Sequence, residues 1–209
     1  MVHVSSSELL VLHAVRVKGM ADVATVAERF ALDGGLVMDL LLDYEAFGWV
    51  TRVRFADLDG WALTATGRME NERRLADELD RTATRSEVIA AHEAFIVLNS
   101  HFLAAVTKWQ IRPTPTDALA ANDHSDTHWD QQVLDDLHDL ARGLRPVGAQ
   151  LTATLERFAG YPERYAAALD RADRAERAWV TQPKIDSCHT VWMELHEDLL
   201  ATLGLERGS

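Results

Sequence analysis

Hydrophobic residues in the first fifty positions recur every three or four residues, which places them on one face of a helix. The spacing predicts three short helices, over residues 5–18, 22–30 and 33–47. Val37, Leu41 and Tyr44 lie on the apolar face of the third helix. Gly19 and Gly48 stand where the first and third helices are expected to end.

The period then changes from helix to strand. Residues 49–55 are rich in β-branched and aromatic side chains, residues 57–60 are typical of a turn, and residues 61–63 can form a returning strand. Thr64 or Thr66 can cap a further helix that runs to about residue 79. The expected order is three helices, a two-stranded wing and a helix.

Two segments are informative about family, DVATVAERFALDGGLVMDLLLDYEAFGWVTR and, after the wing, GWALTATGR. Through these segments, residues 8–75 resemble bacterial winged helix-turn-helix regulators of the MarR, PadR and GntR classes. It implies a winged-helix fold and a transcriptional regulator, although winged helices also serve as protein-interaction modules.

The rest of the chain reads as helical. A seven-residue repeat predicts a helix over 85–110, and its inner row is Val88, His92, Phe95, Asn99, Phe102, Val106 and Trp109. A polar loop over 111–126 precedes a long helix that Gly143 and Pro146 are expected to kink or break. Two further helices are predicted, one from Pro162 to about residue 180 and one from Thr181 or Pro183 to near Gly204.

These elements predict a mainly α protein with two domains. Residues 1–80 are expected to form the winged helix, and residues 81–209 an antiparallel four-helix bundle that dimerises and binds a small effector. The helix over 85–110 could itself form the dimer seam.

Charge argues against a simple DNA-binding surface. The net charge is −12, and residues 1–80 carry 8 Lys and Arg against 14 Asp and Glu. The third helix, which would enter the major groove, has no Lys or Arg, and its expected outer face is Gly35, Met38, Asp39, Leu42, Asp43 and Ala46. Such a face would suit a protein partner or a dimer better than DNA.

Cations lie instead in and after the wing. Arg52 and Arg54 share one side of a strand, and with Arg68 they are the candidate DNA contacts. The alternative is that these arginines are solvated and paired with neighbouring carboxylates.

Polar residues within the apolar rows of the bundle are the candidate effector-binding residues. They are His92 and Asn99 in the first bundle helix and His189, Trp192 and His196 in the last. One interpretation is a ligand pocket, and a stronger one is a metal site that uses the imidazoles. A third interpretation is that each of these side chains makes one hydrogen bond within the core and binds no ligand. We assign no residue as a metal ligand.

Two segments, LHAVRVKGMADVATVAERF and GWALTATGRMENERRLADEL, also resemble helical accessory segments of actinobacterial pyruvate-phosphate dikinase and phosphoenolpyruvate-utilising proteins. This second resemblance implies a regulatory or docking role, because the chain has no phosphotransfer motif.

Enzyme motifs are not found in the sequence. His92-Glu93 and His196-Glu197 lack the second histidine of a zinc-protease helix, and no nucleophile elbow or phosphate-binding loop occurs. The missing motifs predict a protein that is not an enzyme, and the sequence leaves any cofactor unknown. One cysteine and no signal sequence or membrane span predict a cytoplasmic protein.

Overall fold

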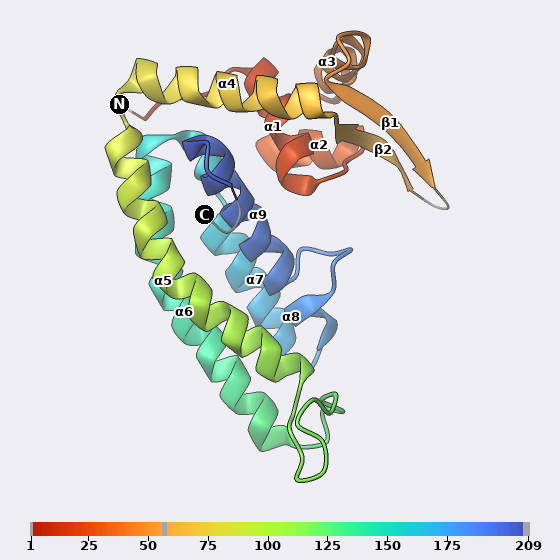
Figure 1. The fold of residues 1–209 in the computed structure, drawn as a ribbon, viewed down its shortest axis with the longest axis vertical. Helices are drawn as coiled ribbons and strands as arrows, with labels where there is room; N and C mark the ends of the chain where they lie inside the picture. The colour runs from red at the N-terminus through yellow and green to blue at the C-terminus, as the bar shows by residue number, and fades with distance from the viewer. Residues whose placement is uncertain (1, 56–57, 207–209) are drawn as a thin grey trace. The chain divides into compact units, whose positions relative to one another are not determined.

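The computed structural model describes residues 2–55 and 58–206, and it is mainly helical with one two-stranded antiparallel sheet, as predicted. Figure 1 shows its elements, which are α1 (Ser7–Lys18), α2 (Val23–Phe30), α3 (Gly34–Ala46), β1 (Val50–Phe55), β2 (Leu58–Leu63), α4 (Ala65–Thr82), α5 (Arg85–Gln110), α6 (Thr127–Thr154), a 3-10 turn (Glu156–Phe158), α7 (Tyr161–Asp173), α8 (Ala178–Thr181) and α9 (Cys188–Leu203).

The chain folds as two compact units. The first unit holds the residues up to Val88 together with residues 153–157 and the segment from Glu194 onward. The second unit holds residues 89–152 and 158–193. The long helices α5, α6 and α9 therefore each contribute to both units.

Helix α1 is the centre of the first unit. It contacts α2, α3, α4 and β2, and almost all of its residues from Leu9 to Val17 are buried. The Ser6 hydroxyl caps it by accepting a hydrogen bond from the Leu9 N–H, at 3.3 Å. A helix with buried residues on all sides is surrounded by protein, and the apolar residues of α1 are covered by the neighbouring helices and β2.

Strands β1 and β2 form a hairpin that pairs Val50 with Leu63 and Arg54 with Asp59. The second strand was predicted to begin at Trp61, but it begins at Leu58, so the expected turn residues 58–60 belong to the strand. Asp57 of that predicted turn lies outside the described residues. The longer strand is stabilised by Ala21, which exchanges two backbone hydrogen bonds with Trp61, at 2.8 and 3.0 Å.

Two segments distant in sequence complete the first unit. The Glu156 N–H donates to the His3 carbonyl at 3.0 Å, and His3 also pairs with Leu155 in a parallel bridge. Ala201 of α9 packs with Leu9 and Leu75 in a small apolar cluster. Residues 153–157 and the end of α9 thus contribute to the same unit as α1 and α4.

The second unit has an aromatic core. The Trp192 indole stacks on Phe102, with ring centroids 4.4 Å apart, and on Phe95, at 5.0 Å. The Tyr165 ring lies 5.6 Å from Trp192, and its hydroxyl donates to the Leu137 carbonyl at 3.3 Å. These contacts join α5, α6, α7 and the beginning of α9.

Helices α5 and α6 run side by side in the second unit (Figure 1). Gly143 permits the close approach, because a Cβ atom at this position would lie 2.8 Å from a methyl carbon of Leu98. Gly143 and Pro146 were expected to kink or break this helix, and the break does not occur, since α6 is one helix from Thr127 to Thr154. Leu144 and Val147 are buried on either side of the proline, and this burial offsets the backbone hydrogen bond that the proline cannot make.

Two helix boundaries differ from the prediction. The helix expected to reach about residue 180 ends at Asp173, and Ala175 adopts a left-handed φ of 67° before the short α8. The last helix begins at Cys188 rather than near Thr181, because Ser187 caps it by accepting from the Thr190 N–H at 3.2 Å.

Candidate functional site

Helix α3 is held in place by three buried side chains and two caps. Val37, Leu41 and Tyr44 face the core of the first unit. The Tyr44 hydroxyl donates to the Glu8 carbonyl at 2.7 Å, and burial raises the pKa of this phenol to about 12. Asp33 caps the first turn by accepting from the Leu36 N–H at 3.0 Å. These contacts fix the position of α3, so its opposite side faces away from the core of the first unit.

The exposed side of α3 combines large apolar residues with carboxylates. Leu42 is 50% exposed and Phe47, directly after the helix, is 61% exposed. Leu36 and Met38 are also exposed, and so are Asp39, Asp43 and Glu45. We call this set the α3 face, and it consists of Leu36, Met38, Asp39, Leu42, Asp43, Glu45 and Phe47.

The outer face predicted from the sequence is exposed at all six of its positions. Leu36, Glu45 and Phe47 were not included in that prediction. Phe47 could have been found from its position beyond the last inward residue, Tyr44, and before the helix-ending Gly48.

The α3 face has the wrong charge for a duplex. It carries three carboxylates, and α3 contains no Lys or Arg. In a major groove these carboxylates would meet phosphate oxygens and repel them, with no cation on the same helix to compensate. Several exposed leucine, methionine and phenylalanine side chains on one short helix are typical of a protein-binding surface.

The three predicted DNA contacts are engaged within the protein. Arg52 Nε lies 2.8 Å from one carboxylate oxygen of Asp59, and Arg54 Nε lies 3.2 Å from the other. Hydrogen bonds to this carboxylate raise the pKa of Arg52, and in turn they lower the pKa of Asp59. Arg68 Nη1 lies 3.2 Å from the Glu197 carboxylate. Each of these exposed pairs would have to open before the arginine met a phosphate.

The other lysine and arginine side chains of the N-terminal segment also have partners within the protein. Of the nine Lys and Arg side chains among the described residues up to Thr82, seven pair with a carboxylate, and Arg29 and Arg81 donate to backbone carbonyls. Glu70 accepts from both Arg73 and Arg74, and these bonds lower its pKa to about 2. The alternative prediction for Arg52, Arg54 and Arg68 was that they are solvated and paired with carboxylates, and the observed ion pairs agree with it.

Four of the five predicted effector residues lie in the second unit. Asn99 accepts a hydrogen bond from the Trp192 indole N–H at 2.9 Å. His189 stacks on Phe102 with centroids 6.2 Å apart. Asn99 thus contacts Trp192, and both Trp192 and His189 stack on Phe102. Trp192 is fully buried and also stacks on Phe95.

His92 and His196, the remaining two predicted effector residues, do not take part in these contacts. His92 is partly buried, and its buried Nε2 atom has no hydrogen-bond partner among the described residues. Burial lowers the pKa of the His92 and His189 imidazoles. His196 belongs to the first unit. A pocket lined by all five residues remains a prediction.

Two surface grooves lie elsewhere. A groove of about 460 Å³ in the first unit is lined by Ser6, Leu9, Arg74, Asp77, Asp80 and Arg81. A groove of about 400 Å³ in the second unit is lined by Leu98, His101, Ala104, Lys108, Asp136, Asp139 and Leu140. Neither includes a predicted effector residue. Across residues 2–55 and 58–206, no three His, Cys, Asp or Glu side chains are grouped so that they could hold a metal ion.

A buried charge cluster in the first unit was missed by sequence reasoning. Arg157, which is fully buried, donates to Glu78, Asp198 and Thr202, and His13 lies 2.9 Å from Asp198. Polar residues that interrupt the apolar rows of α1 and α9 were the available signal. The charged groups of the cluster bond to one another inside the protein, which indicates a structural role.

Among the described residues, α5 alone has the length and apolar composition of a membrane-spanning helix, with a mean hydropathy of 1.4 over its most apolar window. A single helix of this kind does not by itself indicate a membrane protein.

Comparison with known proteins adds no relative, since no family model, curated protein or solved structure matches the chain.

Proposed function

We propose that residues 2–82 form a winged helix and that the protein is a regulator whose α3 face binds a basic surface on a partner protein. The order of α1, α2, α3, the β1–β2 hairpin and α4 supports a winged helix. The composition of the α3 face carries the rest of the proposal.

The chemistry of the partner follows from the two components of the face. Leu42 and Phe47 would be covered by apolar side chains of the partner. Asp39 and Asp43, which are exposed, would be met by lysine or arginine side chains around that apolar centre. An amphipathic basic helix has both features.

The test uses two fluorescent probes, a random-sequence DNA duplex and a synthetic amphipathic peptide of leucine and lysine. At about 50 mM salt, which favours duplex binding over physiological salt, the peptide is expected to bind the protein and the duplex is not. Asp39→Asn/Asp43→Asn and Leu42→Ser are each expected to weaken peptide binding roughly tenfold.

A matched control separates the α3 face from the overall negative charge. Asp135 and Asp170 are exposed carboxylates on helices of the second unit, and Asp135→Asn/Asp170→Asn changes the net charge by the same amount. This variant is expected to bind the peptide as the wild type does. Equal loss in both double variants would show that only net charge attracts the peptide, and the proposal would fail.

A transcriptional regulator that reads DNA is the second candidate. It is favoured by the position of Arg52 and Arg54, which are exposed on β1. Salt-sensitive duplex binding that Arg52→Ala/Arg54→Ala abolishes would establish this candidate instead.

A further inference from the structure

Helix α5 has two different rows of apolar residues. The row predicted as its inner face, which includes Phe95 and Phe102, is buried within its own unit. A substitution at Phe95 would therefore disturb the core rather than test a seam between copies. The opposite side of α5 is exposed and is also apolar.

The exposed side of α5 follows a seven-residue repeat. Ile89, Ile96 and Leu103 form one row, and Ala90, Val97 and Ala104 form the adjacent row. Val97 is 61% exposed and Leu103 is 47% exposed. We call these six residues the α5 face. Its small residues would let a second helix approach closely, while its branched residues supply apolar area.

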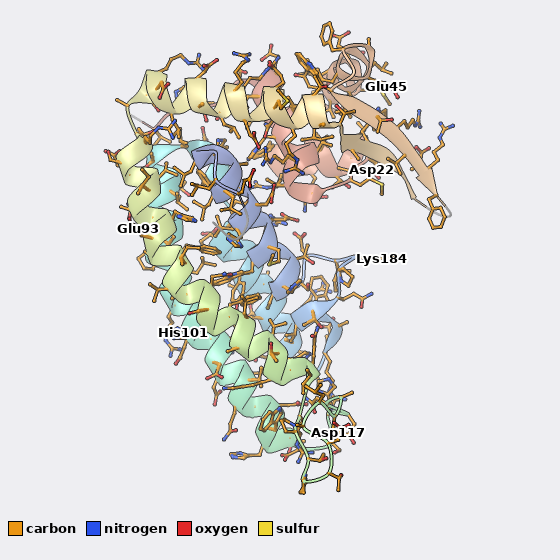
Figure 2. The ribbon with its side chains drawn as sticks, in the orientation of Figure 1. Asp22, Glu45, Glu93, His101, Asp117 and Lys184 are labelled. Carbon is orange, nitrogen blue, oxygen red and sulfur yellow. The ribbon has the colours of Figure 1, made fainter. Side chains whose placement is uncertain are left out.

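Two exposed polar residues of α5 that border the α5 face are arranged symmetrically about Val97. Glu93 lies four residues before Val97 and His101 lies four residues after it, and both are labelled on α5 in Figure 2. Ala90 and Ala104 lie seven residues before and after Val97. If a second copy packed antiparallel with the two Val97 residues together, each Glu93 would lie opposite an imidazole of the other copy, and alanine would lie opposite alanine.

From this pattern we infer that the α5 face is a homodimer interface with a two-fold axis near Val97. A two-fold contact must be self-complementary. Glu93 of each copy could form a hydrogen bond with His101 of the other, and the small alanine side chains would face each other without a clash. The groove beside α5, with Asp136 and Lys108 at its edge, lies next to the same face and would become its rim.

A lipid surface is a poorer occupant for the α5 face. Asp135, Asp136 and Asp139 lie on the neighbouring helix α6, and the protein has a net charge of −12. Anionic lipid headgroups would repel these carboxylates.

The first test is the molar mass of the full chain by light scattering at a protein concentration on the order of 50 µM. The wild type is expected to be a dimer, and Ile96→Glu is expected to be a monomer with an unchanged circular dichroism spectrum. The control is Leu119→Glu, because Leu119 is 76% exposed in the loop after α5 and lies outside the α5 face. A monomeric wild type, or a dimer that Ile96→Glu leaves intact, would overturn the inference.

The second test locates the axis. A Val97→Cys variant is expected to form an intermolecular disulfide under mild oxidation at least tenfold faster than Leu119→Cys, since a disulfide requires Cα atoms about 4.4–6.8 Å apart. The native Cys188 is buried and does not compete. Equal rates of disulfide formation in the Val97→Cys and Leu119→Cys variants would contradict a two-fold axis near Val97. Binding of the wild type, but not of Ile96→Glu, to phosphatidylglycerol vesicles would assign the face to lipid.

Discussion

Arg157 and Glu78 form a buried ion pair, with Nε 3.0 Å from Oε2, although the two residues lie 79 positions apart in sequence. The same guanidinium donates to Asp198 and to the Thr202 hydroxyl of α9. Glu78 also accepts a hydrogen bond from the Ser5 hydroxyl at 2.6 Å. A single arginine therefore connects α4, the turn after α6 and α9 within the first unit.

Arg157→Ala is expected to destabilise the protein strongly. It would leave the Glu78 and Asp198 carboxylates buried without their shared cation, which costs about 3–5 kcal/mol of unfolding free energy. Urea denaturation measures this change. Arg142→Ala is the control, because Arg142 pairs with Asp139 on the exposed surface of α6, and it is expected to cost less than about 1 kcal/mol.

The Asp198 carboxylate predicts a particular pH dependence. Burial raises the pKa of this carboxyl, but His13 and Arg157 lower it by more, so its pKa in the folded protein is below the ordinary value. The unfolded chain takes up a proton at Asp198 near pH 4, before the folded protein does. The stability that ionised Asp198 contributes is thus fully present above that pH and is lost as the pH falls further.

The measurement compares the wild type with Asp198→Asn from pH 6 to pH 3. The variant is expected to be less stable by about 3 kcal/mol at pH 6, and the difference is expected to shrink below pH 4. A difference that stayed constant over this range would show that the carboxylate charge is not what stabilises the cluster.

Two glycine-to-alanine substitutions are expected to differ strongly in their cost to stability. A Cβ atom on Gly67 would lie 1.8 Å from the Trp49 carbonyl oxygen, so Gly67→Ala would push α4 away from the start of the hairpin. A cost of at least about 2 kcal/mol is expected. At Gly143 the nearest atoms belong to the flexible end of the Leu98 side chain, and the gain in helix propensity, about 1 kcal/mol, would offset most of the crowding. Thermal unfolding of both variants checks this contrast.

Cys188 is expected to report on unfolding of the second unit. The thiol is buried, and burial raises its pKa to about 12, so almost no thiolate is present at neutral pH. Its reaction with a disulfide reagent should therefore be at least about a hundredfold slower in native protein than in urea. The comparison is Ser125→Cys, at an exposed position of the polar loop, which should react at nearly the unfolded rate. Fast labelling of native Cys188 would contradict the packing described for α9.

Local signals in the sequence were sufficient to predict where the helices of the N-terminal segment lie. Asp22, Asp33 and Thr64 each cap the helix that follows, and Gly48 has the left-handed φ expected of a residue after a helix, at 71°. These features depend on side chains that bond to backbone a few residues away, which explains why the sequence predicts them well.

Features that depend on contacts between distant residues were not predictable in the same way. The charge cluster needs Glu78, Arg157 and Asp198 to meet, and no spacing within one helix encodes that meeting. The continuous α6 depends on burial around Pro146, which local preference cannot anticipate. Helix α5 has apolar residues on two opposite sides, and the sequence alone did not show that the side with Ile96 and Val97 stays exposed.

Some features of the candidate site could also be predicted from local sequence, and others depend on contacts between distant residues. The exposure of Asp39 and Leu42 follows from helical periodicity, so the composition of the α3 face was readable in advance. The pairing of Arg52 and Arg54 with one shared carboxylate depends on strand register, which places Asp59 opposite Arg54.

The most direct test of the proposed function is backbone hydrogen exchange of the full chain with and without the leucine–lysine peptide, and with and without the DNA duplex. The peptide should slow exchange in α3 and at Phe47, and the duplex should leave the exchange of the N-terminal segment unchanged. Protection of β1 and β2 by the duplex, with none in α3 from the peptide, would contradict recognition of a protein partner by the α3 face.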